Sequence, residues 1–169
     1  MFFVSRLWEN RILFIVMGLI LLFLAPKMAD AGISIAVSGS WHKIIDATDL
    51  TAGAGSGLQS ACTSVSGQVT IDIIGTSGPA DAWRVDVKKI DADWDNTLHP
   101  HVMRTSGGLG GSVDGGTDYR EVTAVDSPFF AGFGDVTGIE VQLRMTGASI
   151  HIAPGFYSTV LEYTVVDVE

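Results

Sequence analysis

From residue 32 onward, apolar and polar side chains alternate with a period of two. The clearest run is residues 139–145, IEVQLRM, in which every second side chain is apolar. Because successive side chains of a strand point to opposite faces of a sheet, this pattern predicts strands with one buried and one solvated face. The same alternation predicts further strands over residues 33–38, 68–73, 83–88, 148–152 and 157–166.

Turn residues separate these segments, and no sustained helical stripe competes with them. Turns are predicted at residues 75–79, at 91–96 and in the glycine-rich stretch 107–116. The one helix candidate, residues 47–61, contains three glycines, which a helix interior disfavours. The sequence therefore predicts an all-β fold over residues 32–169, a single antiparallel β-sandwich of about eight strands with an immunoglobulin-like or pilin-like architecture.

The N-terminus has the features of an export signal. Residues 12–25, ILFIVMGLILLFLA, form an unbroken apolar run behind Arg6 and Arg11, and Ala29-Asp30-Ala31 matches a signal peptidase site. We expect a cleaved signal peptide over residues 1–31, so that the chain contacts a membrane only during export. An uncleaved anchor is the alternative. Either reading places the domain outside the cytosol, in the periplasm, at the cell surface or in the medium.

Charge and cysteine content narrow the possible partners. The chain has 19 acidic and 10 basic residues, a formal net charge of −9. Nucleic acids and anionic membranes both require clustered Lys and Arg, so neither is an expected partner. Cys62 is the only cysteine, which excludes an intrachain disulfide, and we expect a small buried side chain at this position.

Three carboxylates occur at alternating positions in Asp91-Ala-Asp93-Trp-Asp95. This is the oxygen-rich spacing that calcium-binding loops use, and Ca²⁺ is the one cofactor that the sequence suggests. The glycine and glutamate of an EF-hand loop are missing, so only a looser site fits the sequence. A solvated acidic turn explains the same residues without any metal.

Several aromatic side chains are candidates for a carbohydrate platform. Trp94 lies within the acidic turn, and Phe129 and Phe130 follow a proline in a segment that we expect to be a loop. Together with the carboxylates they suggest an extracellular calcium- or carbohydrate-binding module as an alternative function. The competing interpretation is that the phenylalanines pack in the core or cap it, as we expect of Trp83.

Enzyme signatures are missing from the sequence. There is no G-x-S-x-G nucleophile motif, and the glycine-rich stretch 107–116 contains no basic residue of the kind that a phosphate-binding loop uses. We therefore expect no catalytic residues and a non-enzymatic protein.

Both ends of the predicted domain are strands, and terminal strands can be shared between subunits. Residues 32–39, GISIAVSG, place Ile33, Ile35 and Val37 on one face, which suits a donor strand that inserts into a neighbouring subunit. The closing strand would accept it, with one apolar face formed by Tyr157, Leu161, Tyr163 and Val165. The alternative is that both strands pair within their own sheet.

The end of the chain also resembles a known family. Residues 154–165, PGFYSTVLEYTV, are similar to the closing P-G-x-Y-x-x-x-V-x-Y-x-V strand of secreted fimbrial subunits, in particular the spore coat protein U-like pilins. The resemblance implies secretion by a chaperone–usher route and polymerisation by donor-strand exchange, with Ile33, Ile35 and Val37 as donor residues. We thus expect a secreted structural subunit whose partners are copies of itself or other surface subunits.

Overall fold

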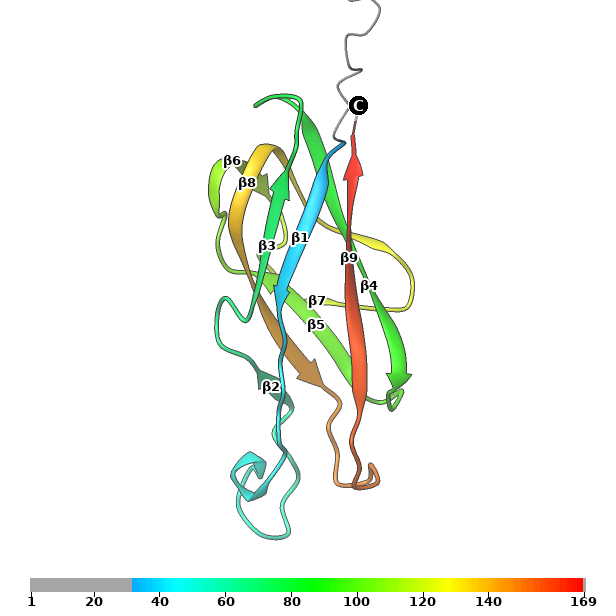
Figure 1. The fold of residues 1–169 in the computed structure, drawn as a ribbon. Coiled ribbons are helices and arrows are strands. Elements are labelled where there is room, and N and C mark those ends of the chain that lie inside the picture. Colours follow the sequence, from blue (N-terminus) through cyan, green and yellow to red (C-terminus); the bar gives the residue numbers. More distant parts are fainter. Residues whose placement is uncertain (1–31, 169) are drawn as a thin grey trace, which may run out of the picture. The chain divides into compact units, whose positions relative to one another are not determined.

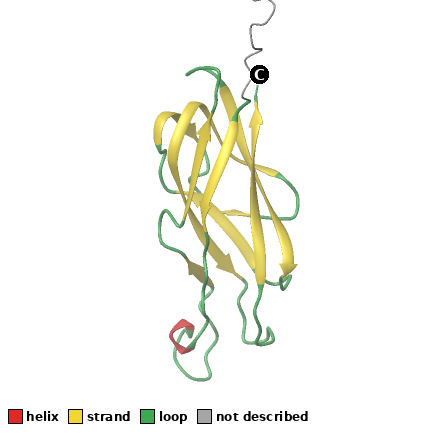
Figure 2. Ribbon diagram, viewed as in Figure 1, coloured by secondary structure: helices red, strands yellow, loops and turns green. Residues whose placement is uncertain are grey.

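The computed structural model describes residues 32–168, and the signal peptide predicted for residues 1–31 lies outside this range. The described residues form β-strands joined by loops, with one short 3₁₀ helix, η1 (Ala47–Asp49), and no α-helix (Figures 1 and 2). Nor do they include a helix long and apolar enough to span a bilayer. The strands are β1 (Ser34–Gly39), β2 (Ala61–Thr63), β3 (Val69–Ile74), β4 (Ala82–Asp93), β5 (His99–Arg104), β6 (Leu109–Asp114), β7 (Arg120–Glu121), β8 (Ser127–Thr146) and β9 (Ser158–Asp167).

The strands build a nearly closed antiparallel sheet in the order β1-β3-β8-β4-β9. The 20-residue strand β8 is its centre, because residues 127–133 pair with β4 whereas residues 136–141 pair with β3. Figure 1 shows β8 curving over one end of the molecule between these two segments. Gly134 lies between the two segments and Gly138 near the start of the second, at φ 67° and 71°, a left-handed conformation that other residues adopt only with strain. On its other side, β8 pairs with β5 and β6.

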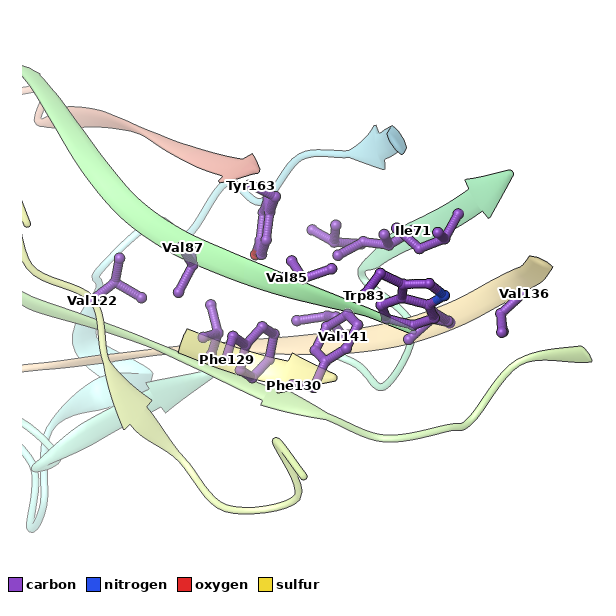
Figure 3. Packing of buried hydrophobic residues seen from close by; sticks show 14 of the residues in the cluster. Ile71, Trp83, Val85, Val87, Val122, Phe129, Phe130, Val136, Val141 and Tyr163 are labelled. Carbon is purple, nitrogen blue, oxygen red and sulfur yellow. The ribbon is translucent and has the colours of Figure 1, made fainter. Parts of the chain in front are cut away.

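The core lies between the two ends of this curved sheet. Trp83 and Val85 on β4 pack with Phe129 and Phe130 on β8, and all four side chains are buried (Figure 3). The Trp83 indole N–H donates to the Gly134 carbonyl oxygen at 2.8 Å, so its one polar atom is satisfied despite burial. Trp83 and Cys62 are both buried, as the sequence predicts.

Most of the predicted strands are confirmed, but residues 148–152 are not a strand. The segment forms a turn within the loop that joins β8 to β9. Pairing of β8 ends at Thr146, opposite the beginnings of β5 and β2, so the chain beyond it has no strand edge to pair with. Gly147 then turns the chain at φ 84°. Alternation alone predicted this strand, and the missing partner explains the error.

The glycine-rich stretch 107–116 also differs from the prediction of a turn, because most of it forms β6. A Cβ atom on Gly110 or Gly111 would collide with the carbonyl oxygens of Asp135 and Phe133 on β8. The glycines therefore allow two backbones to approach closely at a bulge rather than reverse the chain. The predicted turn at 91–96 is likewise shorter than expected, because β4 extends to Asp93.

Candidate functional site

The two terminal strands, β1 and β9, are the outer members of the sheet. β1 pairs only with β3, in a register that places Val37 opposite Ile71, and β9 pairs only with β4. Within residues 32–168, each therefore has one edge without a strand partner. Cα atoms of β1 and β9 approach within 8 Å, and Figure 1 shows the two strands next to each other and running in opposite directions. They are the two unpaired ends of the path β1-β3-β8-β4-β9; among the described residues, β2, β6 and β7 also pair with one neighbour each.

The predicted donor residues lie on β1 or beside it, but they are only shallowly buried. Ile33 and Ile35 are half-buried against the core, and the side chain of Val37 is 44% exposed. Val37 lies on the same side of the strand as Ile35 and opposite the fully buried Ile71, so it faces inward and is nevertheless accessible. In the single chain, β1 thus pairs within its own sheet, which is the second of the two arrangements that the sequence allowed.

The predicted closing strand is more deeply buried than β1. Leu161, Tyr163 and Val165 lie on β9 and face the core, and Tyr163 is only 9% exposed. Tyr157 precedes the strand instead of belonging to it, and its hydroxyl donates to the Ala153 carbonyl oxygen at 2.8 Å. β9 pairs with β4 along its whole length, from Ser158 to Asp167.

An apolar groove of about 830 Å³ opens where β1 and β9 diverge. Its walls come from both terminal strands, the beginnings of β3 and β5, the end of β8 and three loops. No Asp or Glu is among the lining residues, although the chain as a whole is strongly acidic. The lining includes the apolar side chains of Val37, Trp41, Val69, Leu98, Leu143, Met145 and Leu161.

Tyr163 contributes a polar atom to the inner wall of this groove. Its hydroxyl is buried and has no hydrogen-bond partner among the described residues. Burial raises the pKa of Tyr163, because the ionised phenolate would lose its hydration. A buried hydroxyl without a partner is costly, and it marks the groove wall as a place where an added acceptor would be stabilising.

The three carboxylates predicted as a calcium site do not converge. Asp91 accepts from Lys89 Nζ at 2.7 Å, which together with Thr159 holds the pKa of Asp91 below its ordinary value. Asp95 lies in the turn after β4 and accepts from the Thr97 hydroxyl at 2.6 Å, which lowers the pKa of Asp95. Asp93 is exposed. Among the described residues, no group of three His, Cys, Asp or Glu side chains is arranged to hold a metal ion.

The predicted aromatic platform is also not assembled. Phe129 and Phe130 lie on β8 rather than in a loop, and they are only 5% and 3% exposed. Their rings pack on each other at a centroid distance of 4.9 Å, so their apolar surface is buried in the core and does not form an exposed platform. Trp94 is half-buried and does line the groove, with its indole N–H donating to the Leu98 carbonyl oxygen at 2.7 Å.

Neither the groove nor the two longest loops that border it were predicted from the sequence. Residues 40–60 connect β1 to β2, and residues 147–157 connect β8 to β9; we call these segments the tip loops. His42 and Phe156 bring them into contact, with ring centroids 6.4 Å apart. The available signal was the apolar character of Ile44, Ile45, Ile150 and Phe156 in segments with few charges.

Comparison of the chain with models of known protein families, with curated proteins and with solved structures gives no match.

Proposed function

We propose that this protein is an exported, non-enzymatic structural subunit that assembles with copies of itself by exchanging β1 between subunits. The observation that carries the proposal is the pair of open, neighbouring edges on β1 and β9, with an apolar groove between them. An open strand edge is a template for another strand, and natural proteins usually block such edges. Here the edge of β1 carries neither a charged residue nor a proline.

The shallow burial of β1 supports exchange. None of its six residues is buried, whereas β3, to which it pairs, contains three buried residues. Releasing β1 from β3 would therefore break few apolar contacts. The same contacts would form again when β1 pairs with β3 of a second copy. The segment that follows β1, residues 40–45, provides a hinge, because it belongs to no strand or helix and none of its residues is buried. Strand exchange of this kind is a low-cost route to assembly.

The proposal includes a two-layer sandwich as the scaffold. In this description, β9 and β4 form one layer with the first part of β8, and β1, β3 and β5 form the other with its second part. The pairing of β8 on both sides of its bend supports this division. Because β8 belongs to both layers, β1 and β9 would be the facing edges of the two layers, and β1 is the edge strand that a neighbour would replace.

Cross-strand cysteines test the exchange directly. Ser38 and Thr70 are opposite each other in the β1–β3 register, at a separation that a disulfide can bridge. In a Cys62→Ser background, one subunit carries Ser38→Cys and a second, size-tagged subunit carries Thr70→Cys, and the two are co-expressed. We expect a disulfide between the two subunits, because position 38 on β1 of one subunit would lie opposite position 70 on β3 of the other.

The matched control is a single chain that carries both cysteines. If this double variant forms its intrachain disulfide fully while the co-expressed pair forms no mixed disulfide, β1 stays in its own sheet and the proposal is wrong. Mass spectrometry of the same samples tests export, since a cleaved leader leaves a chain that begins at Gly32.

A further inference from the structure

The tip loops lie at the end of the molecule where β1 finishes, as Figure 1 shows, and Figure 2 marks this end by the small helix η1. β1 begins at the opposite end, close to where β9 finishes. The hinge at residues 40–45 therefore belongs to the tip.

The tip loops expose a group of large apolar side chains. Ile44 is 69% exposed, Ile150 is 63% exposed and Phe156 is 72% exposed, and Ile45 adds a fourth partly exposed side chain. Single exposed apolar residues are ordinary on protein surfaces, but several in two adjoining loops indicate an interaction surface. Contact between His42 and Phe156 places the two loops together, so these side chains belong to one region.

The low charge of the tip is compatible with a second copy of this chain as the partner. Residues 147–157 contain no Asp, Glu, Lys or Arg, and residues 40–60 contain only Lys43, Asp46 and Asp49. Lys43 and Asp49 form an ion pair at 2.7 Å, so the tip is close to neutral. Two molecules with a net charge of −9 repel each other, and a contact between tips brings few of these charges together.

Under the proposed exchange, the direction of β1 gives the same orientation. A neighbour's β1 that keeps the antiparallel register with β3 must also end at the acceptor's tip. Its residues 40–45 then lead to the neighbour's own tip, so that the two tips face each other. The first subunit can return its β1 in the same way, which closes a two-fold pair instead of an open chain.

We propose that the tip is a self-association surface that joins two copies tip to tip about a two-fold axis. The two-fold geometry rests on the proposed exchange of β1, whereas the apolar, nearly neutral contact surface does not. In this pair, Ile44 and Phe156 of each copy pack against the tip of the other, and residues 40–45 cross between the bodies. Longer fibres, if they form, require a second contact elsewhere.

Sedimentation velocity on the protein recovered from expression of the full chain tests this surface. We expect a dimer, and we expect the double variant Ile44→Ser/Phe156→Ser to weaken its association at least about tenfold. The control is Leu109→Ser/Val125→Ser, which removes two equally exposed apolar side chains outside the tip and should leave association unchanged. A wild-type monomer, or equal weakening by both double variants, would overturn the tip proposal.

The cysteine pair described above separates this proposal from strand exchange. Mixed disulfides in a ladder of species larger than dimers, unaffected by the tip substitutions, would preserve exchange and eliminate the tip contact. A dimer that the tip substitutions dissociate, but that forms no mixed disulfide, would eliminate exchange and preserve the contact. Mixed disulfides confined to dimers, and lost with the tip substitutions, would support both.

Discussion

Substitution of Tyr163 by phenylalanine tests whether the groove wall contains an unsatisfied hydroxyl. The hydroxyl is buried without a hydrogen-bond partner among the described residues, and a buried unsatisfied polar group costs roughly 1–3 kcal/mol. Tyr163→Phe removes that cost but also a few packing contacts of the oxygen. We therefore expect the free energy of unfolding of the monomer to rise by about 1 kcal/mol, which for a domain of this size raises Tm by roughly 3–5 °C.

The pH dependence of unfolding provides a second measurement on the same pair of proteins. The ordinary pKa of tyrosine is 10.0, and burial raises the pKa of Tyr163 in the folded state. Above pH 10 the unfolded chain loses this proton while the folded chain keeps it. The contribution of Tyr163 to stability is thus complete below pH 10 and is lost above it, at up to about 1.4 kcal/mol per pH unit. Tyr163→Phe should lack this part of the decline.

Urea unfolding followed by tryptophan fluorescence, at neutral pH and between pH 9 and 11, measures both effects. Tyr157→Phe is the matched control, because the same atom is removed from a hydroxyl that donates to Ala153 at 2.8 Å. That variant should be unchanged or slightly less stable. Loss of about 1 kcal/mol or more in Tyr163→Phe at neutral pH would mean that the hydroxyl has a partner, and the reasoning about the groove wall would be refuted.

Two further predictions concern the sheet and the acidic turn. Gly111→Ala places a Cβ against the Phe133 backbone, so we expect a loss of about 1–3 kcal/mol in urea unfolding. Gly57→Ala, which meets no atom within 4 Å, should change stability little, and equal effects of the two would contradict the argument. Calcium should leave Tm unchanged, because Asp91 and Asp95 already accept hydrogen bonds from neighbours; a rise of several degrees that chelator reverses would contradict this.

The pairing of β1 with β3 of its own chain also affects how assembly would be controlled. In the single chain, the strand that could complete a neighbour already occupies its own sheet. Exchange must therefore begin with release of β1 from β3, and its rate would depend on the few contacts that Ile33 and Ile35 make with the core. Under the proposed function, substitutions that weaken these contacts change both the closed monomer and the exchanged form, so exchange rate and final population are separate measurements.

Strands with one buried and one solvated face could be predicted from the sequence because alternation follows directly from strand geometry. The errors occurred where pairing mattered more than alternation. Residues 148–152 alternate but lack an available edge, and residues 109–114 are rich in glycine but lie against β8. A strand forms only where a second segment pairs with it, and the sequence of one segment does not show which segment that is.

The sequence by itself determined the all-β class, the burial of Trp83 and Cys62, and the location of the terminal strands. Only the tertiary structure decided that Phe129 and Phe130 are committed to the core, that Asp91, Asp93 and Asp95 do not converge, and that an apolar groove separates β1 from β9. The residue composition and the alternation of apolar and polar side chains depend only on residues that are close together in the sequence. A groove or a metal site depends on which distant segments meet, and here the bend of β8 decides that by bringing the first and last strands together.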